Sequence, residues 1–419
     1  MMWLKKHPSE SEAEQAPAQQ NSSAKNLKNW IEYRYPLFST LTQQYQKFPM
    51  PRNVNVWWTF GAVLSVILIL MLITGIFLSL GYIPTVEQAF SSVEVIDRQM
   101  PSGWLIRSMH MAGSNLFLAF LYLHLFRGLY YGSYKAPREL LWFSGLILLL
   151  MIMVTAFAGY VLPWGQMSYW AANVGGQAIA AIPWVGEGLT RWIMGGDAPN
   201  AITLHRYFVL HFVMAFTIIG VVFAHILFLH HVKSGNPTGV EPKKEETIHF
   251  HPYYTAKDGF VLAIVAVIMI LLVFFFQDWL TSPENYMPAN PLETPENIAP
   301  EWYFLPFYGM LQVIPFKFGG LLFAAGSLLL LFLVPWLDRS PIRSSRYRPL
   351  YRISLFLLVL AFVTLGFVGK YHSQIILIWA GRFALFYYYL HFLVILPFSN
   401  RFELHRSVPQ ALTNVAEKD

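Results

Sequence analysis

Two apolar stretches decide the fold: residues 104–130, WLIRSMHMAGSNLFLAFLYLHLFRGLY, and residues 205–230, HRYFVLHFVMAFTIIGVVFAHILFLH. Each contains two histidines 14 residues apart, His110 with His124 and His211 with His225. In an α-helix this interval is about 3.9 turns, so the imidazoles of each stretch share one face, about 21 Å apart. Two such helices lying side by side predict two separate sites, each with one histidine from each helix.

An imidazole from each side is a ligand arrangement that suits the iron of haem, so the spacing predicts two haems at different depths. The alternative is that these histidines merely pack at helix interfaces. Ionisable side chains at membrane depth are costly and mark functional sites by default, which favours the haem interpretation.

The composition excludes an ordinary soluble protein, because 55% of the 419 residues are hydrophobic and only 12% are charged. The net charge of +6 lies in short loops instead of one patch, so it does not indicate nucleic-acid binding. The chain has no cysteine, which excludes disulfides, thiolate metal sites, an iron–sulfur cluster and covalent c-type haem within it. Such centres would belong to partner proteins.

Apolar runs of about 20 residues are long enough to cross a bilayer. They predict an all-α, polytopic membrane protein whose eight transmembrane helices span residues 57–80, 104–128, 140–162, 205–230, 259–277, 319–337, 351–369 and 374–398. We expect four organisational regions: a polar tail (1–29) without the apolar core of a signal peptide, a haem-binding four-helix bundle (30–250), a C-terminal helical region (251–400) and a polar tail (401–419).

Loop charges predict the direction of these spans, because basic loops stay in the cytoplasm. The loops after the second, fourth and sixth spans are basic, with Lys135, Arg138, Lys233, Lys243, Lys244, Lys257, Arg339, Arg343, Arg346 and Arg348. Those after the first and fifth are acidic, with Glu87, Glu94, Asp97, Asp278, Glu284, Glu293, Glu296 and Glu301. Both termini are therefore expected in the cytoplasm, His110 and His211 on the outer side, and His124 and His225 on the inner side.

The first and third spans carry glycines at the same 14-residue interval, Gly61 with Gly75 and Gly145 with Gly159. A flat macrocycle inside a four-helix bundle needs positions without side chains, so we expect these glycines to contact the haems; helix packing alone is the alternative.

Three arginines flank the histidines in sequence: Arg107, Arg127 and Arg206. A cation at the membrane boundary can bind a haem propionate, and a helix-end cation that reaches to the interface is the alternative.

Several stretches together resemble the cytochrome b subunit of the respiratory cytochrome bc complex (quinol–cytochrome c reductase, complex III), of the proteobacterial type. They are residues 57–61, 109–110, 123–134 (LHLFRGLYYGSY), 159–168 (GYVLPWGQMS), 225–239, 251–258 (HPYYTAKD) and 300–305 (PEWYFL). The unsplit chain and the 14-residue interval in the fourth span favour the respiratory type over the photosynthetic one.

The resemblance implies a Q cycle in a bacterial inner membrane. Ubiquinol is oxidised at an outer, periplasmic site, one electron passes to a Rieske iron–sulfur protein, and the other crosses two non-covalent b haems to an inner quinone. It also implies a c-type cytochrome subunit and a homodimeric complex. Glutamate at position 301 resembles the version found with ubiquinol.

By resemblance, Glu301 accepts a proton from quinol at the outer site, which requires a carboxylate with a raised pKa. The residues expected to shape this pocket are Tyr160, Trp170, Ala171, Pro300, Trp302 and Tyr303. An interfacial aromatic belt is the alternative for the aromatic ones. A short surface helix pair over residues 176–194 is expected above the site.

At the inner site, His230 and Asp258 are expected to hydrogen-bond the quinone carbonyls and supply protons, joined by Ser234 and Lys257. The chain departs from the family pattern at Ala171, whose methyl group is expected to narrow the outer pocket. It also departs at Gln312, Thr59 and Ala62.

Two other functions fit parts of the pattern. Another dihaem membrane cytochrome, which exchanges electrons with quinone without splitting them, would have fewer spans and no PEWY segment. A proton or solute transporter would use the intramembrane histidines as a relay, and would typically carry inverted repeats that the two halves do not display.

Overall fold

The structure is a computed structural model, and it describes residues 24–371, 374–404 and 406–412. Within that part eight helical segments are long and apolar enough to span a membrane, so the predicted all-α fold with eight spans is confirmed. They are α4 (Phe60–Gly81, preceded by the 3-10 turn η2, Val56–Trp58), α6 (Gly103–Tyr130), α7 (Glu139–Val161), α10 (Ala201–Val232), α11 (Tyr253–Phe275), α13 (Lys317–Leu337), α14 (Pro349–Lys370), and a last segment made of α15 (Ile375–Leu390), the π-helical η7 (His391–Ile395) and α16 (Leu396–Phe402).

The contacts divide the chain into two compact units, of which the smaller comprises residues 1–49 and 249–255. Its described helices are α2 (Ala24–Arg34) and α3 (Leu37–Leu41), followed by the π-helical η1 (Thr42–Gln46). Glu32 accepts hydrogen bonds from the backbone N–H groups of Phe38 and Ser39, at 2.8 and 3.0 Å. Most of the predicted N-terminal tail, up to residue 23, lies outside the described residues, and the tail's last residues, from Ala24, belong to α2.

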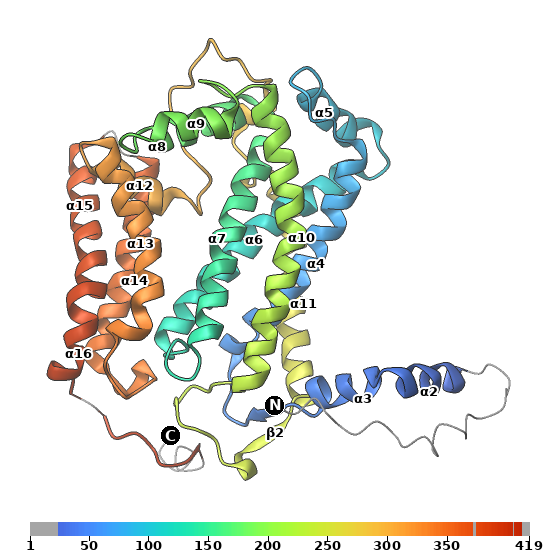
Figure 1. The fold of residues 1–419 in the computed structure, drawn as a ribbon, viewed down its shortest axis with the longest axis vertical. Helices are drawn as coiled ribbons and strands as arrows, with labels where there is room; N and C mark the ends of the chain where they lie inside the picture. Colours follow the sequence, from blue (N-terminus) through green and yellow to red (C-terminus); the bar gives the residue numbers. More distant parts are fainter. Residues whose placement is uncertain (1–23, 372–373, 405, 413–419) are drawn as a thin grey trace. The chain divides into compact units, whose positions relative to one another are not determined.

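The larger unit contains a four-helix bundle in which α4 packs on α6 and α7 packs on α10 (Figure 1). Long apolar helices suit these sequences because a helix satisfies every backbone polar group internally, which lipid cannot do. At the start of α10, Asn200 accepts from the N–H of Ile202 at 2.8 Å, and its own N–H donates to Thr203 Oγ1 at 3.0 Å. This capping box fixes where the helix begins.

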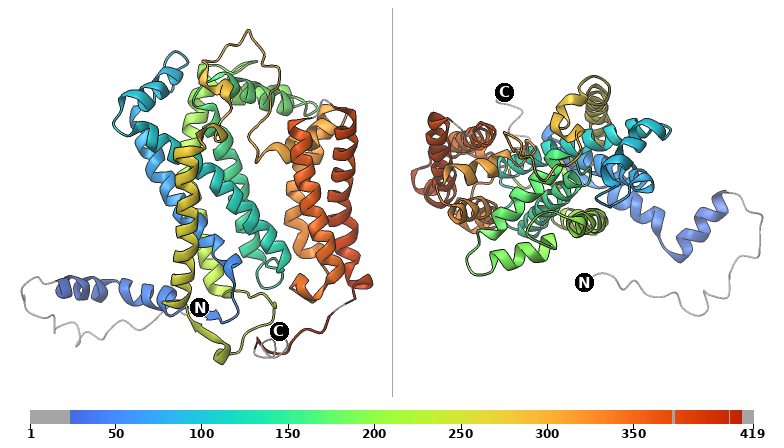
Figure 2. Two further views of the ribbon diagram at one scale, coloured as in Figure 1. Left: turned by 180° about the vertical axis from the view of Figure 1, so that it is seen from behind. Right: turned by 90° about the horizontal axis from the view of Figure 1, so that it is seen from above.

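A second group of helices, α12 (Leu305–Val313) to α16, lies beside the bundle in the larger unit, as the view from above in Figure 2 shows. Side-chain hydrogen bonds join the two groups through buried residues. Tyr122 on α6 donates to the Tyr303 carbonyl at 2.6 Å, and Trp142 on α7 donates to the Leu331 carbonyl at 2.8 Å. The first of these hydrogen bonds holds Tyr303, in the segment just before α12, against α6.

Three short helices lie at one end of the bundle (Figure 1): α5 (Ala89–Gln99), α8 (Gln166–Ala180) and α9 (Gly186–Met194). The surface helix pair predicted for residues 176–194 is present, but it begins ten residues earlier, at Gln166 instead of 176. Polar contacts with residues far away in the sequence hold the start of α8, so the pattern of apolar residues did not predict it. The Gln166 side chain donates to the Glu293 carbonyl, and the Ser168 hydroxyl donates to Asn285 Oδ1.

The remaining described elements are short. They are the 3-10 turns η3 (Lys244–Glu246), η4 (Gln277–Trp279), η5 (Pro283–Tyr286) and η6 (Ser345–Tyr347), and the paired strands β1 (Pro49–Pro51) and β2 (Thr247–His249). The division of the chain near residue 250 into an N-terminal bundle and a C-terminal region stays a prediction.

Candidate functional site

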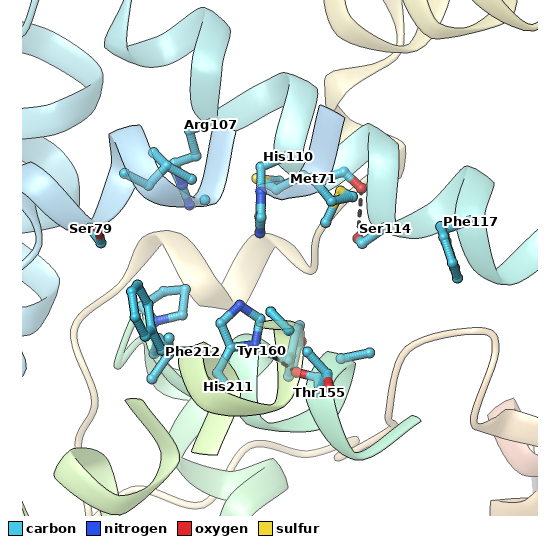
Figure 3. A pocket seen from close by; sticks show the side chains of 18 of the residues that line it. Met71, Ser79, Arg107, His110, Ser114, Phe117, Thr155, Tyr160, His211 and Phe212 are labelled. Carbon is cyan, nitrogen blue, oxygen red and sulfur yellow. Dashed lines mark hydrogen bonds between the residues drawn. The ribbon is translucent and has the colours of Figure 1, made fainter. Parts of the chain in front are cut away.

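The four histidines of the predicted pairs lie on α6 and α10, which face each other across the bundle. The imidazole centres of His110 and His211 are 6.2 Å apart, with their planes at 69°, and Figure 3 shows the two rings pointing toward one another. A bond from a metal to an imidazole nitrogen is about 2 Å long, so two imidazoles on opposite sides of one iron have centres roughly 6 Å apart. His124 and His225 are close enough to interact electrostatically. We call the first pair the outer pair and the second the inner pair, following the charge prediction.

Three of the four histidines use Nδ1 for a hydrogen bond within the bundle. His110 Nδ1 lies 2.9 Å from Thr74 Oγ1, His225 Nδ1 lies 2.8 Å from Ser144 Oγ, and His211 Nδ1 lies 2.7 Å from the Thr155 carbonyl oxygen. A carbonyl only accepts, so His211 Nδ1 donates and its Nε2 keeps the lone pair that a metal needs. This arrangement leaves Nε2 of His211 available to hold a metal ion.

Each predicted glycine lies against a different histidine. A Cβ atom added at Gly159 would be 2.5 Å from His211 Cε1, one at Gly75 3.2 Å from His110 Cε1, and one at Gly145 3.2 Å from His225 Cε1. At Gly61 the corresponding distance to His124 Cε1 is 4.0 Å. The glycines on α4 and α7 therefore leave room for the imidazoles themselves, tightly at three positions and loosely at the fourth.

The surroundings of the inner pair contain buried polar atoms that have no hydrogen-bond partner among the described residues: His124 Nδ1, Arg127 Nε and the Trp58 indole nitrogen. The Arg127 guanidinium lies over the Trp58 ring, 4.0 Å from its centre. Buried donors normally have a partner, so unpaired ones beside a histidine pair fit an anionic group such as a haem propionate.

The other two predicted arginines lie at the outer end. Arg107 forms an ion pair with Asp97 of α5 and lines the cavity described next. Arg206 donates to the Trp192 carbonyl of α9, and the described lining of that cavity does not include it. Arg107 is thus next to the outer pair, whereas the Arg206 side chain points to the surface helix.

A cavity of about 270 Å³ opens between the helices at the outer end. Both outer histidines line it, together with two of the predicted glycines and three of the predicted outer-site residues: Gly75, Gly159, Tyr160, Glu301 and Tyr303. Apolar side chains of α4, α6 and α10 line much of the remaining surface, among them Met71, Phe117 and Phe212. The predicted outer haem site and the predicted proton acceptor thus share one mostly apolar cavity.

Glu301 is the chemically distinctive group in this cavity. Burial raises the pKa of its carboxyl to about 7, although a hydrogen bond from the Tyr160 hydroxyl acts in the opposite direction. Burial also raises the pKa of the Tyr303 hydroxyl well above its ordinary value. Near neutral pH Glu301 can therefore exchange a proton, while Tyr303 stays protonated.

The neighbours of Glu301 in sequence are held by α6. The Trp302 indole N–H donates to Asn115 Oδ1 at 2.7 Å, and the Tyr303 carbonyl accepts from Tyr122. Pro300 is partly buried just before this turn. Ala171 is buried in α8, and it is not among the described residues that line the cavity. Trp170 donates to the Asn290 carbonyl at 3.3 Å.

The predicted inner-site residues lie near the ends of α10 and α11. His230 is partly buried in the last turn of α10, Ser234 is buried just beyond it, and Asp258 is partly buried in α11. Lys257 donates to the Val54 carbonyl at 2.9 Å, which joins the start of α11 to the segment before α4. These residues gather at one end of the bundle, and His230 and Asp258 come from separate helices.

A buried ion cluster, which the sequence did not predict, lies on the same side as the α6–α7 loop. The Asp338 carboxylate accepts from Arg348 at 2.8 Å and from the Tyr134 hydroxyl at 2.6 Å, and pairs with Lys135 at 2.7 Å. Although burial acts to raise it, these two cations hold the pKa of Asp338 below its ordinary value. In the sequence, Lys135 and Arg348 count as loop charges. The one signal for their ion pairs was Asp338, an acidic residue next to the basic residues of the loop after the sixth span.

Comparison with known proteins agrees with this geometry. The family model described as Cytochrome b/b6/petB matches residues 45–233, and the one described as Cytochrome b(C-terminal)/b6/petD matches residues 288–389. Cytochrome b of Rickettsia bellii is 45% identical over 384 residues, which cover 91% of this chain and 96% of that protein. The chain belongs to the cytochrome b family.

Two further similarities extend the comparison. A protein named cytochrome b/c1, from Bradyrhizobium diazoefficiens, is 43% identical over 385 residues, covering 92% of this chain and 56% of that protein. A solved structure titled "Hyperthermophilic respiratory Complex III" contains a chain with a TM-score of 0.85 and 32% identity, which covers 90% of this chain and 99% of the other.

Family membership establishes the general biochemistry. The chain is an integral membrane protein with b-type haem, it carries electrons in a respiratory chain, and it is similar to the core subunit of an oxidoreductase, complex III, whose substrate is quinone.

Proposed function

We propose that this chain oxidises ubiquinol at the outer end of the bundle and reduces quinone at the inner end, as part of a proton-translocating Q cycle. Two haems, each between one histidine of α6 and one of α10, would supply reversible one-electron chemistry. The observation that carries the proposal is the outer cavity, which the His110–His211 pair and Glu301 line together.

At the outer end, oxidation of a quinol to a quinone releases two electrons and two protons. Glu301 and Tyr160 bind the quinol hydroxyl region, and the Glu301 carboxylate accepts a proton. Its pKa of about 7 supports this role, because an acceptor works best with a pKa near the working pH. Tyr303, Pro300, Trp302 and Ala171 shape the surroundings.

At the inner end, His230 and Asp258 hydrogen-bond the two carbonyls of a quinone and deliver protons to it, with Ser234 and Lys257 as further polar neighbours. Their position on two different helix ends supports this assignment. Arg127 would hold a propionate of the inner haem, and Arg107 would hold one of the outer haem. Arg206 is the third arginine proposed to contact a haem, on the basis of the sequence. In the structure its guanidinium donates a hydrogen bond to the Trp192 carbonyl.

The partners are a Rieske iron–sulfur protein and a c-type cytochrome, as the similarity to complex III implies, and the lack of cysteine in this chain agrees with centres that lie in other proteins. The name of the Bradyrhizobium relative, cytochrome b/c1, supports the second partner. We further propose a homodimeric complex in the bacterial inner membrane, with both termini in the cytoplasm. Residues 30–250 form the haem-binding region and residues 251–400 the C-terminal region, between polar tails 1–29 and 401–419.

A redox titration of the purified complex tests the proposal. We expect two b-type components in reduced-minus-oxidised spectra, each titrating as a one-electron centre, and reduction of cytochrome c by added ubiquinol. A single b-type component, or two components without ubiquinol oxidation, would contradict it.

A further inference from the structure

A second residue of α6 connects the outer histidine pair to the Glu301 segment. Asn115 lies five residues after His110 and lines the same cavity as Glu301. Its side chain makes two hydrogen bonds: Nδ2 donates to the Met111 carbonyl at 2.9 Å, and Oδ1 accepts from the Trp302 indole at 2.7 Å. The first bond fixes which way the amide faces, and so presents the oxygen to Trp302.

Tyr122 acts on the same segment from the same face of α6, because seven residues are about two turns of a helix. Its hydroxyl donates to the Tyr303 carbonyl at 2.6 Å, and its ring lies 6.3 Å from the Trp302 ring. Asn115 thus holds the side chain of Trp302, and Tyr122 holds the backbone of Tyr303. These are the two residues that follow Glu301.

The turn itself transmits this constraint to Glu301. The Phe304 N–H donates to the Glu301 carbonyl at 2.8 Å, and the Leu305 N–H to the Trp302 carbonyl at 3.3 Å. A shift of Trp302 would therefore move the backbone of Glu301. On its other side the Glu301 carboxylate meets the Tyr160 hydroxyl of α7.

We propose that Asn115 is a positioning residue of the outer site, which fixes the Glu301 carboxylate relative to the His110–His211 pair by accepting the Trp302 hydrogen bond. Trp302 is 41% exposed, so packing alone leaves its indole free to turn, and the hydrogen bond to Asn115 specifies its orientation. This inference rests on the proposed role of Glu301 as the proton acceptor. Asn115 itself does not exchange protons and is not a catalytic residue.

The test is a double-mutant cycle in the complete complex with Asn115→Leu and Trp302→Phe, each of which removes one partner of the hydrogen bond. The measurements are kcat and KM for ubiquinol, the pH profile of kcat, and the visible spectrum of the haems. Trp142→Phe is the matched control, because it removes another indole hydrogen bond, to the Leu331 carbonyl, that does not involve the outer cavity.

We expect each single variant to lower kcat by roughly two- to tenfold, the range that one net hydrogen bond covers. The pH profile should shift, because the surroundings of Glu301 change, while both haem spectra remain unchanged. The double variant should be no slower than the slower single one. Trp142→Phe should keep the parental pH profile.

Several outcomes would overturn the inference: parental kcat and pH profile in both single variants, additive losses in the double variant, or an equal pH shift in Trp142→Phe. If the complex with Asn115→Leu does not assemble, Trp302→Phe still tests the hydrogen bond, because it changes the partly exposed partner. The variant Glu301→Gln distinguishes the two hypotheses. If it oxidises ubiquinol at the parental rate, the proposed function fails. If it is slow while Asn115→Leu keeps the parental rate, only the positioning role of Asn115 is refuted.

Discussion

The outer and inner ends of the bundle share the same ligand spacing but differ in their surroundings. At the outer pair both Nδ1 atoms have partners, Thr74 Oγ1 and the Thr155 carbonyl, and the adjoining cavity contains Glu301. At the inner pair His124 Nδ1 has no partner among the described residues, and the cation Arg127 is nearby with an unpaired Nε. Each pair thus has an arginine nearby, but Arg107 at the outer pair is engaged by the Asp97 carboxylate, so the electrostatic surroundings of the two pairs differ.

This comparison teaches that one helical interval can be repeated to build two sites with different surroundings. The interval sets the depth of each pair, while residues on neighbouring helices and loops set its electrostatics. The following variants are arranged by the size of the effect that we expect.

The largest effect should come from removing one inner ligand. In His124→Leu we expect loss of the inner haem and retention of the outer one, because the two pairs are about 21 Å apart and share no ligand. Haem content per chain and redox difference spectra check this. His205→Leu is the control, since His205 is an exposed histidine on the same helix as His211 and His225. Loss of both haems in a folded protein would refute the independence of the two ends.

The next effect concerns Glu301, the carboxylate that lines the outer cavity. Glu301→Gln should slow ubiquinol oxidation by roughly 10²-fold or more, the size expected when a general base is lost, with haem content unchanged. In the parent, the accepting carboxylate form accumulates as pH rises through the pKa of about 7, so the rate should rise between pH 6 and 8 and then level off. In Glu301→Gln this rise should disappear. A parental pH profile in the variant would assign the proton acceptor to another group.

A smaller effect should separate the glycines of the two ends. Gly159→Ala places a Cβ at 2.5 Å from His211 Cε1, whereas Gly61→Ala places one at 4.0 Å from His124 Cε1. Overpacking costs about 1–3 kcal/mol, so Gly159→Ala should lower thermal stability and alter the outer haem spectrum. Gly61→Ala should lower thermal stability less, because its added Cβ stays at an ordinary contact distance from the imidazole. Equal behaviour of the two variants would show that the imidazoles move freely.

Local patterns predicted the helices and the histidine positions well. The predicted bounds of the eight spans agree with the structure to within a few residues, with three exceptions: α11 begins six residues earlier than predicted, α10 begins four residues earlier, and the last segment ends four residues later. The start of the α8–α9 pair was wrong by ten residues, because Gln166 and Ser168 are held by contacts to residues 293 and 285. Ala171 lies in α8 and is not among the described residues that line the cavity, so its expected narrowing of the outer pocket stays a prediction.

By itself the sequence determined the membrane spans, the two histidine pairs and the glycines beside them, because helical geometry depends only on intervals along one chain. Tertiary structure alone decided which groups are buried together. It raised the pKa of Glu301, buried the Asp338–Arg348–Lys135 cluster, and joined Asn115 to Trp302, 187 residues away. The physical reason is that desolvation and hydrogen-bond partners depend on which distant segments meet, and no interval within a single helix encodes that.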